Sequence, residues 1–153
     1  MAYNPLYRGD TNTAASRTAR STSSGYQNGS GGLLAQCTPV ATNSFGQLIA
    51  VDVSVEATVM SMIGVTGEDI PNSTSGSVYD SGRVENVSLP GFSIGDAIYV
   101  SKAGFLTNIK PSEGVGGFVA GDFVIFVGVI VKNEFNPLQK DLKLLIDAKI
   151  GQL

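Results

Sequence analysis

A ten-residue phrase occurs twice in this sequence and constrains the fold more than any other feature. Residues 91–100 are GFSIGDAIYV and residues 117–126 are GFVAGDFVIF, with two glycines, a phenylalanine and an aspartate in the same places. A Gly–Asp pair is typical of a tight turn, because glycine accepts positive φ and aspartate hydrogen-bonds the nearby backbone. The β-branched and aromatic residues that follow favour a strand. Each copy therefore predicts a turn that starts a strand. The predicted turn residues are Gly95, Asp96, Gly121 and Asp122.

Asp96 and Asp122 have an alternative interpretation as a carboxylate pair for acid–base chemistry or metal binding. We favour the turn, which is the commoner use of aspartate in this context. The chain has no histidine and a single cysteine, Cys37, so it lacks a recognisable zinc, haem or iron–sulfur ligand set. Histidine is also the usual base beside a serine or cysteine nucleophile. We predict a protein that is not an enzyme and holds no cofactor or metal, with Cys37 serving as a small apolar residue.

Residues 47–63 alternate between apolar and polar side chains. The apolar members are Ile49, Val51, Val53, Val55, Ala57, Val59 and Ile63, and the polar members are Asp52, Ser54, Glu56 and Thr58. A period of two places the apolar set on one face of a strand, whereas a helix would mix the two sets. We predict one or two strands with one buried face.

The remaining β signals are short apolar runs separated by Gly, Pro and Asn turns. They predict a strand near residues 35–41, a turn at 44–47, a loop at 64–77, a strand at 78–87 with a bulge at Gly82, a hairpin turn at 101–104 leading into 105–107, and a connecting loop at 111–117. Residues 123–131 are apolar on both faces and predict a central strand covered on both sides, within a sandwich or at a subunit interface. Residues 142–150 alternate and predict a last strand in preference to a short helix. About eight such strands predict an all-β fold, either a compact β-sandwich or a small barrel.

Residues 1–32 are predicted to form a long extended N-terminal arm, and residues 33–153 the β domain. Sixteen of the twenty-four residues 9–32 are Gly, Ser, Thr or Asn, which is too little apolar surface to offset the entropy of ordering. Thirty-two residues span roughly 100 Å when extended, enough to reach a neighbouring subunit. The expected partner contacts are Tyr3, Leu6, Tyr7, Arg8, Arg17, Arg20 and Tyr26. The apolar members could equally pack on their own domain, and the arginines equally suit a solvated arm.

Charge and hydropathy exclude two classes of partner. The net charge of −3 offers no general attraction to nucleic acid. The longest apolar run, residues 118–131, has fourteen residues and contains Asp122, so it is too short to span a membrane. The polar residues after Met1 give no sign of a targeting peptide. We expect neither nucleic acid nor membrane as a partner.

The segment from Gly95 to Thr107, followed by Pro111 and the apolar residues 124–131, resembles a phrase common in virion proteins of tailed bacteriophages. It is found in small capsid decoration (cement) proteins and in β domains of fibres. The resemblance covers about residues 90–131. It implies a β-hairpin in a compact β domain and brings no catalytic residues with it.

The resemblance implies a virion location and a non-enzymatic structural role. The first expectation is a capsid decoration (cement) protein that stabilises the shell through subunit and arm contacts. Its partners would be the major capsid protein, other virion proteins and copies of itself in a homotrimer. The alternative is a fibre, tail or adaptor subunit that joins virion components or contacts the host, because the Ser/Gly-rich arm departs from the smallest decoration domains. A carbohydrate-binding β module is a third hypothesis, disfavoured because the chain has no tryptophan.

Overall fold

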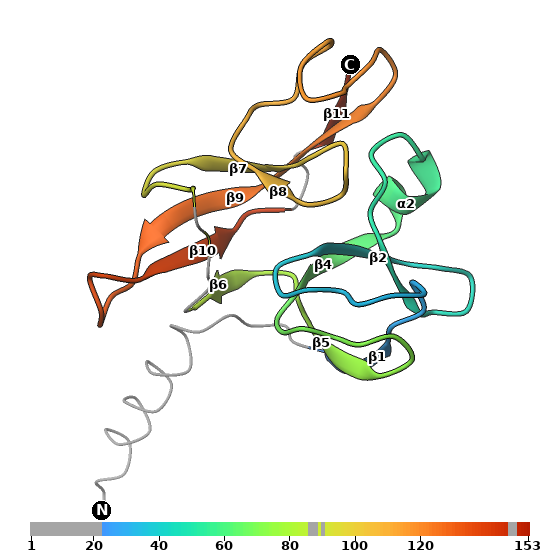
Figure 1. Cartoon of the computed structure of the whole chain (residues 1–153), viewed down its shortest axis with the longest axis horizontal. Coiled ribbons are helices and arrows are strands. Elements are labelled where there is room, and N and C mark those ends of the chain that lie inside the picture. The colour runs from blue at the N-terminus through green and yellow to red at the C-terminus, as the bar shows by residue number, and fades with distance from the viewer. Residues whose placement is uncertain (1–22, 86–88, 90, 147–149) are drawn as a thin grey trace, which may run out of the picture.

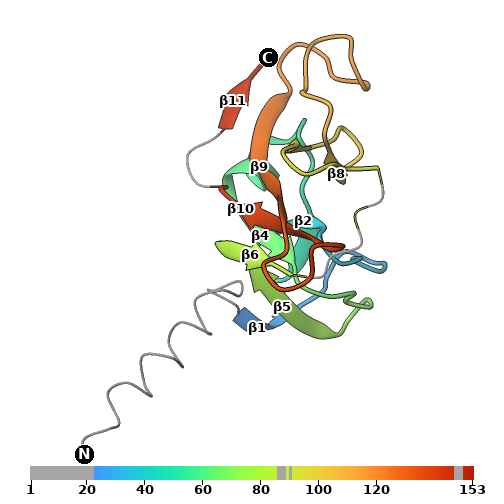
Figure 2. The ribbon, with the colours of Figure 1, turned by 90° about the vertical axis from the view of Figure 1, so that its left-hand side faces the viewer.

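Two antiparallel sheets make up the part of the chain that the computed structural model describes, which is residues 23–85, 89, 91–146 and 150–153. The sheets lie against each other as shown in Figure 1. In both Figure 1 and Figure 2, strand β11 and the C-terminus are at one end of the molecule, and strands β1 and β5 are at the other. The prediction of an all-β fold is confirmed, and the arrangement is that of a sandwich.

The first sheet has five strands in the order β1-β5-β4-β2-β3. Their bounds are β1 Ser23–Gln27, β2 Pro39–Thr42, β3 Leu48–Ala50, β4 Met62–Thr66 and β5 Ser75–Tyr79. A five-residue helix, α2 (Glu56–Met60), lies between β3 and β4 in the chain.

The second sheet has the order β6-β10-β9-β7-β8, with β11 also paired to β9. Their bounds are β6 Gly82–Val84, β7 Ala97–Val100, β8 Leu106–Thr107, β9 Phe123–Lys132, β10 Lys140–Leu144 and β11 Ile150–Gln152. Strand β9 is the centre of this sheet, because it pairs with three other strands, β7, β10 and β11.

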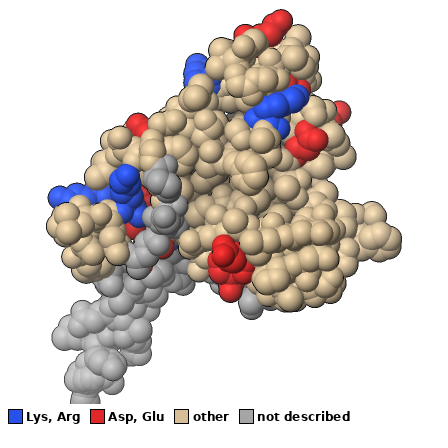
Figure 3. All heavy atoms as spheres, viewed as in Figure 1, with Lys and Arg blue, Asp and Glu red and all other residues tan. Residues whose placement is uncertain are grey.

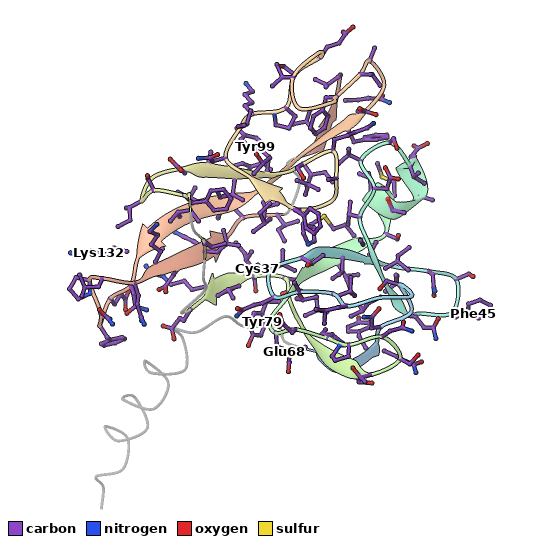
Figure 4. The ribbon with its side chains drawn as sticks, viewed as in Figure 1. Cys37, Phe45, Glu68, Tyr79, Tyr99 and Lys132 are labelled. Atoms are coloured by element: carbon purple, nitrogen blue, oxygen red, sulfur yellow. The ribbon has the colours of Figure 1, made fainter. Side chains whose placement is uncertain are left out.

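The main core lies between the two sheets. It joins Ala41 and Val65 of the first sheet to Ile98, Ile125 and Leu142 of the second. Burial of this apolar surface is the main force that holds the sheets together. Cys37 belongs to the same cluster and is 7% exposed (Figure 4), as expected for a small apolar residue. A smaller cluster covers the first sheet separately. Its buried members are Leu34, Val40, Leu48, Ile70 and Val78.

The prediction for residues 47–63 is only partly right. The alternation correctly predicts that Val51, Val53 and Val59 are buried, but Val55 and Ala57 of the same predicted face are exposed. The chain forms β3, a turn, α2 and the start of β4 instead of continuous strand. The reason is topological: β2 pairs with both β3 and β4, so the chain must cross from one side of β2 to the other between them. The Thr58 side chain closes this crossing, since its oxygen accepts the N–H of Asp52 at 2.9 Å.

The predicted strand at residues 78–87 is wrong as a single strand. Its first part belongs to β5 in the first sheet, and its second part is β6 in the second sheet. Gly82 has φ of +79° and opens β6, so it marks the passage between sheets and not a bulge within one strand. Residues 86–88 lie outside the described residues. The loop predicted at 64–77 is also too long, because β4 and β5 occupy both of its ends.

Several local predictions agree with the structure. The hairpin turn at residues 101–104 joins β7 to β8, with Gly104 N–H bonded to the Ser101 carbonyl at 2.9 Å. Strand β9 is central, although its two faces differ: Ile125 and Val127 are fully buried, whereas Val124 and Phe126 are half-buried. The last predicted strand, residues 142–150, is right only in part, because β10 ends at Leu144 and a separate strand, β11, begins at Ile150.

Residues 23–32, which we assigned to the arm, are part of the sheet domain. Strand β1 pairs with β5. The Asn28 side chain is 1% exposed and donates hydrogen bonds to the carbonyls of Ile70 at 2.7 Å and Gly32 at 2.8 Å, while its oxygen accepts the N–H of Ser30 at 2.8 Å. Backbone pairing and a buried amide therefore hold a stretch whose composition alone indicates disorder. Residues 1–22 lie outside the described residues, so the rest of the arm stays a prediction.

Candidate functional site

The first Gly–Asp pair lies in a turn that leads into β7. The N–H of Asp96 donates to the carbonyl of Ser93 at 3.0 Å, and the N–H of Ser93 donates back to the Asp96 carboxylate at 2.8 Å. Gly95 is the third residue of this turn and has φ of +97°. A turn whose third residue has positive φ while its second does not is a type II turn, and this type favours glycine as the third residue.

The second pair repeats this geometry before β9. The N–H of Asp122 donates to the carbonyl of Val119 at 3.1 Å, and the N–H of Val119 donates to the Asp122 carboxylate at 2.9 Å. Gly121 has φ of +95°. The two copies of the phrase therefore fold into the same turn, in which the aspartate bonds the N–H three residues before it.

Each turn is also bonded to a neighbouring segment in the manner of a β-bulge, the first to β9 and the second to the residue after β11. Gly95 N–H donates to the carbonyl of Ile130 at 2.8 Å, and Ile130 N–H donates to the carbonyl of Asp96 at 3.0 Å. Gly121 and Asp122 make the same pair of bonds with Leu153, at 2.8 and 2.9 Å. Two residues thus face one, with glycine at positive φ in the first position, which is the pattern of the glycine type of bulge. The phrase is a device for turning the chain and starting a strand against an existing one.

The two aspartates differ in their other partners. Asp96 is half-buried and accepts a hydrogen bond from the Asn108 amide at 2.9 Å. Asp122 is 2% exposed, and both of its oxygens lie 2.7 Å from the Lys102 ammonium. In the described part of the chain no hydrogen bond links the two carboxylates, so the structure does not assemble them as an acid–base pair.

These contacts lower the pKa of both carboxyl groups. For Asp122 the main cause is the hydrogen bond from Lys102, followed by the bond from the Val119 N–H. For Asp96 the main cause is the bond from the Ser93 N–H, followed by that from Asn108. A hydrogen bond donated to a carboxylate favours its charged form. Both groups are therefore ionised near neutral pH and unsuited to donating a proton.

The Lys102–Asp122 ion pair lies where three chain segments meet. Lys102 comes from the β7–β8 turn, and Asp122 precedes β9. The N–H of Phe123, the next residue, donates to the carbonyl of Val53 at 2.8 Å, which ties this point to the segment between β3 and α2. The pKa of Asp52 in that segment is lowered mainly by hydrogen bonds from Ser54 and to a smaller extent by the positive charge of Lys102. The hydrogen bond between Phe123 and Val53 therefore connects β9 of the second sheet to the first half of the chain.

The sequence matches no protein-family model and no curated protein. Among the residues that the structure describes, no three histidine, cysteine, aspartate or glutamate side chains gather in a way that could hold a metal ion. Over the same residues, no helix has the length and apolar character needed to cross a bilayer.

Of the seven expected partner contacts, Tyr26 lies within the described residues. Tyr3, Leu6, Tyr7, Arg8, Arg17 and Arg20 lie outside the described residues. Tyr26 is in β1, half-buried, and packs against the smaller apolar cluster of its own sheet. Of the two interpretations that the sequence left open for Tyr26, packing on its own domain is the one observed.

Two buried polar residues were missed by the sequence analysis. Asp141 is completely buried and Asn133 is 5% exposed. The Asn133 amide donates to the Asp141 carboxylate at 2.9 Å, and Arg83 approaches the same carboxylate at 3.4 Å. This network fixes the β9–β10 hairpin. Asn133 follows a strand and precedes Pro137, which is a turn signal, but nothing local indicates that Asp141 is buried.

Proposed function

We propose that this chain is a non-enzymatic structural component of a tailed-bacteriophage particle, namely a capsid decoration (cement) protein that acts as a homotrimer on the shell. The observation that carries the proposal is the segment that resembles phage virion proteins. In the fold it corresponds to the β7–β8 hairpin and the central strand β9. A β-hairpin in a compact β domain is what that resemblance implies.

The way polar groups are used in this domain supports a mechanical role. Asp96 and Asp122 hold turns, and the Lys102–Asp122 pair joins segments distant in sequence. Buried Asn28 and Asp141 are likewise engaged in bonds that fix loops. Such networks restrict the conformations open to the backbone. A rigid β domain of this kind suits a subunit that must keep its shape within a larger assembly.

The N-terminal arm supplies the second part of the proposal. Residues 1–22 contain Arg8, Arg17 and Arg20 against one acidic residue, Asp10, which gives a charge of +2. Subtracting +2 from the net charge of −3 leaves −5 for residues 23–153. Opposite net charges favour contact between the arm of one copy and the domain of a neighbour. An extended segment that reaches a neighbour can also add to the edge of its sheet.

A fibre, tail or adaptor subunit is the second candidate. The length of the polar N-terminal segment favours it, because the smallest decoration domains do not carry such an arm. The two candidates differ in copy number, since a shell protein covers the whole capsid and a tail component does not.

The test is the copy number in purified virions of the phage that encodes this chain. An antibody raised against residues 23–153 would identify the band, and a stained gel calibrated on the major capsid protein would give the number of copies. Hundreds of copies support the decoration role, and about a dozen or fewer support the fibre, tail or adaptor role. Absence from virions that contain all their other structural proteins would overturn both.

A further inference from the structure

Two hairpin tips on this molecule are built in the same way. The first joins β2 to β3, and the second joins β9 to β10. In the first, the Asn43 side-chain oxygen accepts the N–H groups of Phe45 at 2.9 Å and Gln47 at 3.0 Å. In the second, the Asn133 side-chain oxygen accepts the N–H groups of Phe135 at 2.9 Å and Asn136 at 2.8 Å. Each tip thus has an asparagine at its base and a phenylalanine two residues further on.

Both tips hold large apolar side chains in solvent. Phe45 is 84% exposed in the first tip, and in the second Leu138 is 92% and Phe135 is 65% exposed. The second tip is fixed further, because Leu138 N–H donates to the Asn136 side chain at 3.0 Å and Asn133 is bonded to the buried Asp141. A single exposed apolar residue is ordinary. Apolar residues on preorganised tips lose little entropy on docking, which is the property of a binding anchor.

The tips point away from each other. Figure 1 shows the β9–β10 hairpin at the left-hand end of the molecule. Figure 4 places Phe45 at the right-hand end and Lys132, the last residue of β9, at the left-hand end. One tip therefore cannot cover the other within one copy, whereas the tips of successive copies can meet.

The half of the molecule that carries the first tip is acidic, whereas the second tip is flanked by lysines. Residues 23–81, which include every strand of the first sheet, contain acidic residues and no lysine or arginine. These acidic residues are Asp52, Glu56, Glu68, Asp69 and Asp80. The second tip is flanked by Lys132 and Lys140, and its Glu134 is paired with Arg83 at 3.6 Å. Figure 3 shows lysine and arginine at the left-hand end and an uncharged surface at the right-hand end, where Phe45 lies. Joining two second tips would bring lysines together, which disfavours a symmetric contact.

We propose that copies of this chain associate head to tail, with the Phe45 tip of one copy against the Leu138 tip of the next. A contact between two different surfaces closes into a ring when the rotation between copies divides a full turn, and extends into a filament otherwise. The inference adds to the proposed function the contact through which copies join, and it rests on that function only for its biological setting. It is testable on the purified chain.

The experiment is cross-linking between cysteines placed beside the tips. Ser44→Cys marks the first tip and Gln139→Cys the second, both at exposed positions. The native Cys37 does not interfere, because it is buried and burial raises its pKa to about 12. With a flexible bis-maleimide, we expect a mixture of the two single variants to give at least fivefold more dimer than either alone. The double variant should give cross-linked species larger than the dimer, which end at the trimer if the contact closes into the proposed homotrimer.

Three further variants show whether the apolar anchors cause the association. Phe45→Ser or Leu138→Ser in the cysteine background should reduce the mixed cross-link to the level of the single variants. Phe105→Ser is the matched control, since Phe105 is 61% exposed on the β7–β8 hairpin, and it should leave the yield unchanged. Circular dichroism melting would verify that every variant is folded.

Two results would overturn the head-to-tail contact. One is a cross-link in either single variant that equals the mixture, which would indicate a symmetric contact. The other is a mixed yield that Phe45→Ser and Leu138→Ser leave unchanged in folded protein. Many copies per virion together with either result would refute this inference and leave the decoration role standing. The expected cross-links in a chain absent from virions would do the reverse.

Discussion

Replacing Gly95 or Gly121 by alanine should destabilise the β domain equally at the two sites. Both glycines have nearly the same φ, +97° and +95°, and both have open space where a Cβ would be built. No steric clash therefore contributes. What remains is the cost of holding an L-residue at positive φ, which is the same physical effect in both copies of the phrase.

The expected size follows from two opposing terms. A left-handed conformation costs an alanine roughly 1–2 kcal/mol. The less flexible unfolded chain returns roughly 0.4–1 kcal/mol of stability. The net loss should be about 1 kcal/mol at either site, or a fall in melting temperature of about 2–4 °C for a chain of this size. Valine should cost more at both positions, because a β-branched residue is rarer still at positive φ.

Thermal and urea unfolding followed by circular dichroism would measure this. Gly151→Ala is the matched control, since Gly151 lies in β11 with open space around it and no positive φ. Alanine there should be neutral or stabilising, because glycine weakens a strand. Unchanged stability of both turn variants, or an equal loss in Gly151→Ala, would refute the assignment of the Gly–Asp phrase as a strained turn.

Three other predictions concern charge, the thiol and the N-terminus. Asp122→Ala should lower the melting temperature more than Asp96→Ala at pH 7, because only Asp122 is buried against an ammonium group. The pKa of the Asp122 carboxyl is lowered in the fold, so the stability that this group contributes is present above its unfolded pKa of about 3.9 and is lost as the pH falls below that value. The unfolding free energies of wild type and Asp122→Asn should therefore converge in acid. A difference that stays constant with pH would contradict this. Burial raises the pKa of Cys37 from 9.0 to about 12, so the thiol ionises first in the unfolded chain. Between pH 9 and 12 the free energy of unfolding should therefore fall more steeply in wild type than in Cys37→Ala, by roughly 1.4 kcal/mol per pH unit. Equal dependence on pH in the two proteins, measured by urea unfolding, would exclude this effect. Deleting residues 2–22 should leave the melting temperature of the domain unchanged, whereas deleting residues 2–32 should lower it by removing β1; equal melting temperatures of the two truncated chains would show that β1 adds no stability.

The elements that the sequence determined are those whose cause lies within about ten residues. The Gly–Asp turns require only a residue that accepts positive φ and a short carboxylate that reaches the N–H three positions earlier. The β7–β8 hairpin and β9 follow from a local turn and a run of β-branched residues. The period of two correctly predicted the burial of Val51, Val53 and Val59, but wrongly that of Val55, because α2 replaces the strand from that point.

The tertiary structure alone decided features that depend on partners distant in sequence. Local patterns do not specify which strand lies beside which. The position of β2 between β3 and β4 forces a turn and a helix into an alternating segment, and the passage at Gly82 sends one apparent strand into two sheets. Lys102 and Asp122 are twenty residues apart, and only the packing of β7 beside β9 brings them together. Strand β1 has a composition typical of disorder and is ordered because β5 offers it backbone hydrogen bonds, which depend little on the side chains of the strand that adds.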